Sequence, residues 1–334
     1  MTAKITAAKG SPYARIMGVG GYRPQRVVDN EEILQHIDSS DEWIRSRSGI
    51  RTRHWASADE SVAEMTLEAG GKAIVDAGIT ADQVGAVIIS TVSHFKQTPS
   101  IATEIAHRLG TGDAAAFDIS AACAGFGYGL TIAKGLITEG SAEYVLVVGV
   151  ERLSDLTDIN DRTTAFLFGD GAGAVVVGPS KEPGIGPSVW GSDGDKADVI
   201  SQTVSWEEFR TKPETPFPAL RQEGQTVFRW AVYEMAKVAQ RALDAAGVSP
   251  DDLDVFIPHQ ANMRIVDSLV KTLKLPPGVA VARDVETTGN TSAASIPLAM
   301  ERMLATGQAK SGDTALIIGF GAGLVYAAAV VTLP

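Results

Sequence analysis

The chain has 334 residues, 45% of them hydrophobic and 21% charged, which is enough for one large or two medium globular domains with a substantial core. Its 40 acidic and 29 basic residues give a net charge of −11, which argues against nucleic acid as a general partner but leaves room for a local basic patch. The single cysteine excludes an internal disulfide and favours a reducing, cytoplasmic compartment.

We expect no membrane segment at either end of the sequence. Lys4, Lys9 and Arg15 enclose no apolar run of the kind that a secretory signal contains. The stretch 314–334 is uncharged and long enough to span a membrane. Because glycines at 319, 321 and 323 divide it into two β-branched runs, two buried strands joined by a glycine turn are the better prediction.

A tryptophan with several arginines follows a predicted helix start near residue 40. The sequence Ser-Asp-Glu-Trp-Ile places Trp43 just inside this helix, and arginines follow at 45, 47, 51 and 53. Guanidinium groups bind phosphates and an indole ring stacks on a base, so the cluster suits a nucleotide. A solvated basic edge is the alternative interpretation.

Two halves of the sequence resemble each other. The pattern of helix end, glycine, acidic turn and buried strand at 76–88 returns at 245–257, and the strand pattern at 141–149 returns at 311–319. A third pair, Gly-Ala-Gly at 171–173 and 321–323, is expected to open the last strand of each half. The matched blocks predict a duplicated α/β unit in which each half has a largely parallel, buried sheet.

The stretch 118–129, Asp-Ile-Ser-Ala-Ala-Cys-Ala-Gly-Phe-Gly-Tyr-Gly, contains the only cysteine. A strand is predicted before it, and the apolar spacing after it predicts a helix that begins at about Cys123. Small residues around Cys123 allow a sharp turn of the nucleophile-elbow type. The positive end of the helix would favour the thiolate, although a lone cysteine is often a buried apolar residue without a catalytic role.

Regular patterning stops between 181 and 222, where prolines and glycines are frequent. We expect an insertion here that covers the core and shapes a substrate entrance. A long amphipathic helix is predicted to follow over 225–246.

Two polar residues in the second half accompany the cysteine. His259 ends the apolar strand 255–258, and strand ends are where α/β sheets place their sites. Asn290 lies in a Gly-Asn-Thr-Ser turn; adding the repeat offset of 169 to 123 gives 292, in the same turn. Cys123, His259 and Asn290 form a coherent acyl-transfer set, with a thiolate nucleophile and two side chains that stabilise an oxyanion.

These motifs give the chain a resemblance to a known family. Ser-Asp-Glu-Trp-Ile at 40–44, Ala-Cys-Ala-Gly-Phe around Cys123, Phe-Gly-Asp-Gly-Ala-Gly at 168–173, Pro-His-Gln-Ala-Asn at 258–262 and Gly-Asn-Thr-Ser-Ala-Ala-Ser at 289–295 are similar to motifs of thiolase-like condensing enzymes. Specifically, the chain resembles the β-ketoacyl-acyl-carrier-protein synthase III family over nearly its whole length. Members of this family initiate type II fatty-acid synthesis.

The resemblance implies an α/β fold, the duplicated α-β-α-β-α five-layered thiolase-like fold with two pseudo-symmetric halves. Residues 1–180 would form the half with the nucleophilic cysteine, 181–223 the insertion, and 224–334 the half with His259 and Asn290. Acyl-CoA would acylate Cys123, and decarboxylative condensation with malonyl-acyl-carrier protein would follow. The N–H groups of Cys123 and Ala322 would bind one oxyanion, and His259 and Asn290 the enolate oxygen. Ala322 replaces the family's glycine.

The resemblance also assigns residues that bind substrates. The CoA residues would be Trp43, Arg47, Arg162, Gly224, Phe228 and Asn262, with Trp43 and Arg162 on opposite faces of the adenine. The acyl-pocket residues would be Thr98, Leu153, Phe168 and Phe320. The basic patch that docks the acidic carrier protein would be Arg229, Arg264, Lys271 and Lys274. Thr98 is small where some relatives have phenylalanine, which predicts a roomier pocket for branched or medium-length starters.

The implied assembly is a cytoplasmic homodimer with acyl-CoA and malonyl-acyl-carrier protein as partners, and with no nucleic acid, membrane, metal or cofactor apart from the CoA thioester substrate. A thiolase would require a second cysteine, and an elongating condensing enzyme a second histidine in place of Asn290. A ketosynthase or acyltransferase of a polyketide or other secondary-metabolite pathway could retain every motif. A non-catalytic carrier-protein-binding homologue and a cysteine hydrolase are further alternatives.

Overall fold

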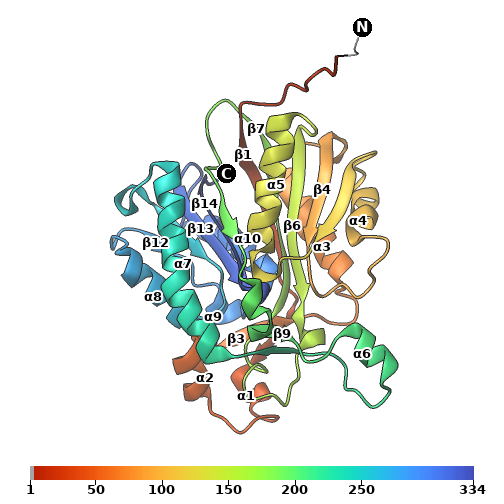
Figure 1. The fold of residues 1–334 in the computed structure, drawn as a ribbon, viewed down its shortest axis with the longest axis vertical. Helices are drawn as coiled ribbons and strands as arrows, with labels where there is room; N and C mark the ends of the chain where they lie inside the picture. Colours follow the sequence, from red (N-terminus) through yellow and green to blue (C-terminus); the bar gives the residue numbers. More distant parts are fainter. Residues whose placement is uncertain (1–3) are drawn as a thin grey trace.

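Two five-stranded sheets form the frame of the computed structural model, which describes residues 4–334 (Figure 1). The first sheet has the order β1 (Tyr13–Tyr22), β7 (Asp170–Ser180), β6 (Tyr144–Arg152), β4 (Val84–Ser90), β5 (Ala115–Ile119). The second has the order β8 (Val189–Gly191), β14 (Val325–Thr332), β13 (Thr314–Gly321), β11 (Val255–Pro258), β12 (Ala280–Val281). Strand for strand, the two sheets have the same order, which confirms the duplication.

One strand in each sheet runs against the others. β7 is antiparallel to both β1 and β6, and β14 is antiparallel to both β8 and β13, while the remaining pairs are parallel. The prediction of largely parallel sheets is therefore confirmed, and 314–334 forms two antiparallel strands. The third repeat pair is confirmed for 171–173, which opens β7, but it is wrong for 321–323, which spans the end of β13 and the turn before β14.

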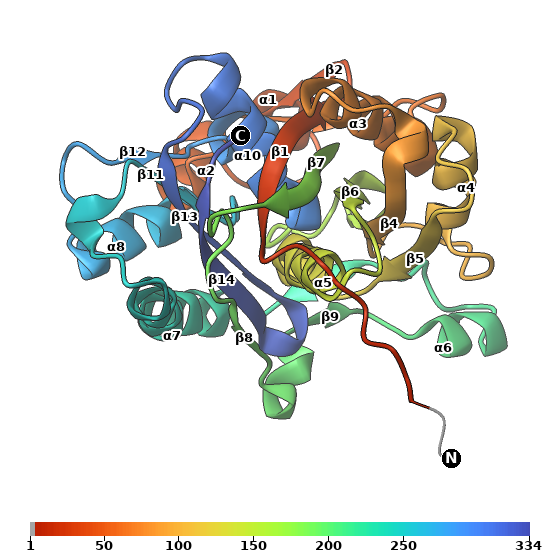
Figure 2. The same ribbon diagram turned by 90° about the horizontal axis from the view of Figure 1, so that it is seen from above.

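Helices cover the sheets in five layers. Helices α5 (Gly125–Glu139) and α10 (Ser295–Ala305) lie between the sheets and contact strands of both (Figures 1 and 2). The outer layers are α3 (Val62–Asp76) and α4 (Ile101–Leu109) on one side, and α7 (Gly224–Ala246) and α8 (Met263–Leu273) on the other. This is the five-layered arrangement that the resemblance implied. The inner strands have no solvated face, so β4 and β6 are almost continuously apolar.

Tight packing of α5 between the sheets depends on glycine. A Cβ at Gly127 would lie 2.7 Å from the Cβ of Ala327 in β14, closer than side-chain atoms approach one another. The backbone of the first turn of α5 is thus in direct contact with the second sheet. This close approach holds the two halves together directly beneath the cysteine turn.

Shorter elements surround the entrance to the core. They are α1 (Asn30–Ile33), α2 (Asp41–Ser48), α6 (Trp206–Thr211), α9 (Val285–Thr288), and the strand pairs β2 (Arg26–Asp29) with β3 (Thr52–Trp55) and β9 (Ile200–Gln202) with β10 (Leu220–Gln222). Within 181–223, β8 joins the second sheet, while the β9–β10 hairpin and α6 lie outside both sheets. No helix in residues 4–334 is long and apolar enough to cross a membrane.

Candidate active site

Cys123 lies in a sharp turn between β5 and α5. A single 3-10 turn, Ala122–Ala124, precedes α5, so the helix begins at Gly125, slightly later than predicted. Ala122 has φ +43°, a left-handed conformation that non-glycine residues rarely adopt. The turn is therefore strained as in a nucleophile elbow, and Cys123 directly follows the strained residue and lines a cavity.

The second half repeats this elbow. Ser292 has φ +47° and opens the 3-10 turn Ser292–Ala294 before α10. Matching the two turns pairs Ala122 with Ser292 and Cys123 with Ala293, one residue beyond the position that the sequence offset gave. The two elbows contact each other.

The end of β13, which belongs to the second half, packs directly against Cys123. A Cβ at Gly321 would lie 2.8 Å from the Cβ and 2.9 Å from the Sγ of Cys123. Only hydrogen fits at this position. Ala322 follows directly, in the turn Ala322–Leu324, and it lines the same cavity as Cys123.

Burial raises the pKa of the Cys123 thiol to about 12. The Ser292 side chain lowers this pKa by hydrogen bonding and the Glu151 carboxylate raises it. The thiol is therefore protonated near neutral pH because burial dominates, contrary to the expectation that the helix end would favour the thiolate.

His259 enters the cavity from the end of β11. Its backbone N–H donates to Ile318 at 2.7 Å, and its ring lies edge-on to Phe320, with centroids 5.3 Å apart. Nδ1 and the Ser295 hydroxyl are 2.7 Å apart. Burial lowers the imidazole pKa to about 3, so the ring is neutral at physiological pH.

Asn290 is fixed by both its backbone and its side chain. Its N–H donates to Leu167 at 2.9 Å, and its carbonyl accepts from Gly169 at 3.0 Å. Its Oδ1 accepts from the Ser292 N–H at 2.9 Å. Because the amide oxygen is engaged, the NH₂ group is the part available to the cavity.

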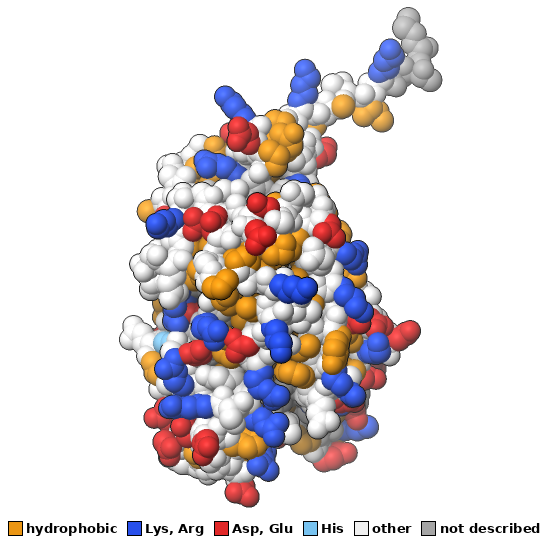
Figure 3. Space-filling model, turned by 90° about the vertical axis from the view of Figure 1, so that its left-hand side faces the viewer, with side chains coloured by type: hydrophobic (Ala, Val, Ile, Leu, Met, Phe, Trp, Pro, Cys, Tyr) orange, Lys and Arg blue, Asp and Glu red, His pale blue; other side chains and the backbone are white. Residues whose placement is uncertain are grey.

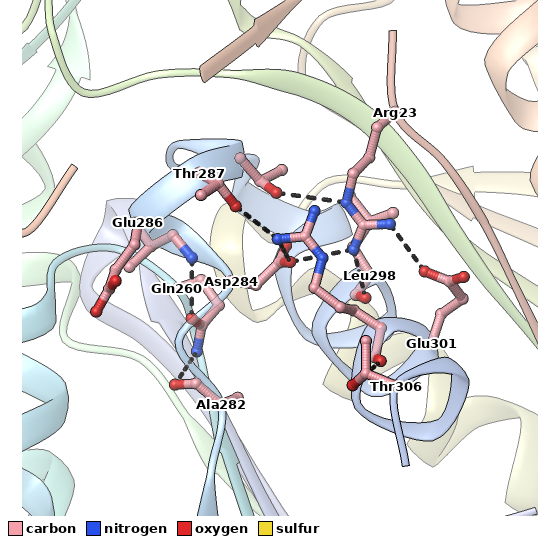
Figure 4. Close-up of polar contacts among 12 residues, drawn as sticks. Arg23, Gln260, Ala282, Asp284, Glu286, Thr287, Leu298, Glu301 and Thr306 are labelled. Carbon is pink, nitrogen blue, oxygen red and sulfur yellow. Dashed lines mark hydrogen bonds and ion pairs between the residues drawn. The ribbon is translucent and has the colours of Figure 1, made fainter. Parts of the chain in front are cut away.

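A polar network supports the turn that holds Asn290. Figure 4 shows Arg23 pointing toward Asp284 and Glu301, with contacts of 3.1 and 2.8 Å. Arg302 also contacts Asp284, at 2.7 Å. Arg23 further donates to Thr288, two residues before Asn290. The buried Asp284 thus joins α10 to the segment that leads into the turn.

One cavity of about 660 Å³ brings most of these groups together. Cys123, His259, Asn290 and Ala322 line it, and so do three of the predicted acyl-pocket residues, Leu153, Phe168 and Phe320. Thr98 is exposed and does not line it. Its predicted reach into a second subunit therefore remains a prediction.

A second hollow of about 650 Å³ adjoins the first, because Asn290, Ala261, Ile265, Val227 and Gln222 line both. Five of the predicted CoA residues line this hollow, namely Trp43, Arg47, Gly224, Phe228 and Asn262. A path therefore leads from the surface tryptophan to the cysteine.

The groups at the outer mouth already contact one another. The Arg162 guanidinium lies 5.1 Å from the centre of the Trp43 ring, and that of Arg47 lies 5.9 Å from it. Both polar ends of the Asn262 side chain are engaged. Its Oδ1 accepts from the Arg264 N–H at 2.9 Å, and its Nδ2 donates to the Arg47 carbonyl at 2.9 Å. A base that stacks on Trp43 would have to displace Arg162, and Asn262 would exchange a partner to bind ligand.

The predicted docking residues are all exposed. Arg229 on α7 and Arg264 on α8 border the second hollow, while Lys271 and Lys274 lie at the other end of α8. Figure 3 shows many Lys and Arg side chains on the lower half of the side that carries these helices, with some acidic groups among them.

Sequence patterns did not reveal three polar residues near the sulfur. Thr91 and Ser292 line the cavity, and Glu151 is fully buried behind them at the end of β6. A lone carboxylate in an apolar strand was the available signal for Glu151. Within residues 4–334, no cluster of His, Cys, Asp or Glu side chains could hold a metal ion.

Comparison with known proteins gives matches along the whole chain. Family profiles described as 3-oxoacyl-[acyl-carrier-protein] synthase III and as its C-terminal part match residues 117–194 and 243–333. A β-ketoacyl-[acyl-carrier-protein] synthase III of Streptomyces glaucescens is 78% identical over 331 residues, covering 99% of each chain. A mycobacterial counterpart from Mycobacterium avium is 54% identical, with the same coverage.

Solved structures give the same picture. A priming β-ketosynthase from the R1128 polyketide biosynthetic pathway superposes with a TM-score of 0.97 at 45% identity, covering 99% of both chains. The 3-oxoacyl-[acyl-carrier-protein] synthase III of Aquifex aeolicus gives a TM-score of 0.88 at 36% identity, covering 96% of this chain and 99% of its own. The similarity extends through both sheets and both elbows.

Proposed function

Because this chain belongs to the 3-oxoacyl-[acyl-carrier-protein] synthase III family of acyl-transferring condensing enzymes, we propose that it catalyses the initiating condensation of type II fatty-acid synthesis. The observation that carries the proposal is the single cavity lined by Cys123, His259 and Asn290 and reached through a second hollow. A thiol, a neutral imidazole and an amide NH₂ are suited to a thioester that is first transferred and then attacked by a carbanion.

In the first half-reaction, the Cys123 thiolate attacks the carbonyl carbon of an acyl-CoA. The backbone N–H groups of Cys123 and Ala322 stabilise the tetrahedral oxyanion, and CoA leaves as the thiol. The alanine at 322 is compatible with this role because a backbone group performs it. Trp43, Arg47, Arg162, Gly224, Phe228 and Asn262 hold the CoA.

In the second half-reaction, malonyl-acyl-carrier protein loses CO₂ and forms an enolate. The Asn290 NH₂ and the His259 Nε2–H stabilise the enolate oxygen. Ser295 supports this tautomer: its hydroxyl accepts from the Gln260 N–H at 3.4 Å and can donate to Nδ1. The carbanion attacks the acyl-cysteine, giving 3-oxoacyl-acyl-carrier protein and freeing Cys123.

Intact-protein mass spectrometry with a panel of acyl-CoAs tests the first half-reaction. An acyl adduct that is absent from Cys123→Ser supports it. Release of CO₂ from malonyl-acyl-carrier protein tests the second, with loss expected in His259→Ala and Asn290→Ala. A protein that binds carrier protein without acylation or CO₂ release would be a non-catalytic homologue, and steady hydrolysis of acyl-CoA would indicate a hydrolase.

A priming ketosynthase of a polyketide pathway is the second candidate, favoured by the 0.97 TM-score to such an enzyme. The reaction would be the same and the carrier protein would differ. Kinetics with fatty-acid and polyketide carrier proteins, each loaded with malonate, would separate the two roles. A lower KM by tenfold or more for one carrier would identify the pathway.

We also propose that the enzyme is a homodimer. β5 is an edge strand of the first sheet, and its residues are half-buried or exposed. The exposed Thr98 precedes α4, which contacts β5. A second copy paired at this edge would bring Thr98 toward the neighbouring cavity. Light scattering after size-exclusion chromatography gives the mass, and a monomer would contradict the proposal.

A further inference from the structure

Arg53 is the buried member of the arginine run that follows Trp43. The arginines at 45, 47 and 51 are exposed, whereas Arg53, in β3, is 0% exposed. It is therefore placed neither to bind the phosphate of a nucleotide nor to form a solvated basic edge, the two interpretations that the sequence allowed for this run. Burial lowers the pKa of Arg53 to about 10, so its guanidinium is still charged at neutral pH.

The Arg53 guanidinium joins two parts of the chain that are far apart in sequence. On one side, Nη1 donates to the carbonyls of Val28 at 3.2 Å and Asp29 at 2.9 Å, and Nη2 donates to Asn30 Oδ1 at 2.6 Å. On the other side, Nη2 donates to the Phe166 carbonyl at 3.1 Å. These four acceptors are all neutral. A buried cation held by neutral groups is costly, which indicates a role beyond stability.

The segment 166–169, which Arg53 holds at Phe166, forms the wall beside Asn290. Phe168 makes a parallel β-bridge with Asn290, and the two backbone hydrogen bonds of Asn290, at 2.9 and 3.0 Å, belong to this bridge. Phe166 lines the second hollow and Phe168 lines the cysteine cavity. A displacement of the segment would therefore move Asn290 relative to both.

The stem of Arg53 packs against both strands of this bridge. A Cβ at Gly289, directly before Asn290, would lie 2.7 Å from the Cβ of Arg53. A Cβ at Gly169 would lie 3.5 Å from the same atom. The side chain thus supports the turn of Asn290 with its first carbon while its head group holds Phe166.

Other residues of β3 support the same two segments. Trp55 is two positions after Arg53, and its Nε1–H donates to the Phe168 carbonyl at 3.1 Å. The Thr52 hydroxyl donates to the Thr287 carbonyl at 2.9 Å. β3 is therefore a support on which the wall segment and the turn of Asn290 are both fastened.

We propose that Arg53 is a positioning residue for decarboxylation. By holding 166–169 against 289–290, it places the Asn290 NH₂ group where the enolate oxygen forms. Arg53 lines neither cavity, so it acts through Asn290 and does not touch the substrate. Such donors have to be held within about 0.5 Å of their productive position. The inference rests on the proposed function and adds a residue to its second half-reaction.

Arg53→Lys tests the proposal. Lysine keeps the charge, but its single head group on a flexible stem cannot reproduce the fork that spans both sides. CO₂ release from malonyl-acyl-carrier protein and acylation by acyl-CoA are each measured as a maximal rate and a KM. We expect maximal CO₂ release to fall by about tenfold or more and maximal acylation to change by less than about threefold, with both KM values unchanged.

Three other results would each contradict this expectation. Equal losses of both maximal rates would mean only that fewer molecules are folded, and would overturn the proposal. A higher KM for both substrates with unchanged maximal CO₂ release would mean that Arg53 shapes the second hollow and does not position Asn290. A wild type that forms no acyl adduct or releases no CO₂ would overturn the proposed function as well, whereas wild-type rates in Arg53→Lys contradict the positioning role alone.

Trp55→Phe is a second variant, in case lysine at 53 prevents folding. Phenylalanine keeps an aromatic ring but removes the N–H that binds the Phe168 carbonyl, so maximal CO₂ release should fall about threefold while acylation is unchanged. Trp190→Phe is the matched control, since Trp190 is exposed on β8 and lines neither cavity. CO₂ release in Trp55→Phe equal to that of the control would show that the wall segment needs no support from β3, against the proposal.

Discussion

At the scale of single residues, the site depends on the absence of a side chain at Gly321. Gly321→Ala would place a methyl group 2.8 Å from the Cβ of Cys123. Its φ is close to 180°, so the damage would come from the collision and not from the backbone. We expect acylation to fall by about 100-fold as the sulfur is displaced, with a loss of about 1–3 kcal/mol in stability.

Gly278→Ala is the control for this substitution. A Cβ at Gly278 would have no other atom within 4 Å, so alanine fits there. Acylation rates from intact-mass time courses compare the two variants. Equal rates would mean that the second half does not shape the cysteine turn.

His259 makes a pH-dependent contribution to folding stability. Its pKa falls from 6.5 in the unfolded chain to about 3 in the folded one, so between these values the unfolded state binds more protons. Stability therefore falls as pH decreases below about 6.5, by about 2 kcal/mol between pH 7 and pH 5 from this residue.

Urea unfolding at the two pH values measures this effect. The loss on acidification should be about 2 kcal/mol smaller in His259→Gln than in wild type. The raised pKa of Glu151 acts in the opposite direction between about 4.5 and 7, but it is common to both proteins and cancels in the comparison. An identical pH dependence would show that the imidazole is not kept neutral.

The reactive residues were the part of the site that the sequence could predict. Cys123 is unique, and His259 and Asn290 follow strand and turn patterns, so local chemistry singled them out. The raised thiol pKa and the buried Glu151 carboxylate near it could not be predicted, because both arise from groups that only the folded chain brings around the sulfur.

At the scale of elements, the segment from Asp284 to Asn290 is held by ion pairs. Asp284→Ala would leave Arg23 and Arg302 without their shared carboxylate. We expect a loss of about 3–5 kcal/mol in the free energy of unfolding. Decarboxylation should weaken more than acylation, because Asn290 rather than Cys123 lies at the end of this segment.

Asp267→Ala provides the comparison. Asp267 pairs with Arg283 at 2.8 Å, but both side chains are at least half exposed. Its loss should cost at most about 1 kcal/mol. Urea unfolding of the two variants tests the difference, and equal costs would contradict the structural role of the Asp284 network.

Helix α8 is predicted to contact the carrier protein. Reversing the charge of one residue of this helix in Lys271→Glu should raise the KM for malonyl-acyl-carrier protein about tenfold, equivalent to about 1.4 kcal/mol. Acylation by acyl-CoA should be unchanged, since Lys271 lines neither the cysteine cavity nor the second hollow. Lys310→Glu, between α10 and β13, is the control of equal charge, and an equal effect there would indicate a general response to net charge.

Element order was predictable from the repeat, but exact register was not. The offset located the second elbow to within one residue. It failed for the third pair because β6 and β7 are separated by the long segment 153–169, whereas β13 and β14 are joined by a tight turn. Loop length varies between duplicated halves while the sheet order does not.

At the scale of the whole molecule, starter choice is predicted to depend on a second copy. Thr98→Phe would add a ring where the exposed threonine is expected to reach the neighbouring cavity. Competition between acetyl-CoA and isobutyryl-CoA should shift toward acetyl by about tenfold or more. The same preference in both proteins would show that residue 98 does not line an acyl pocket in the assembly.

The matching bends at 122 and 292 show that two copies of one unit have taken different roles. Each copy has the same strained backbone, but the first bend carries alanine and cysteine where the second carries serine and alanine. Neither copy alone encloses a reaction chamber. Two identical subunits could not specialise in this way, because one substitution would change both bends at once.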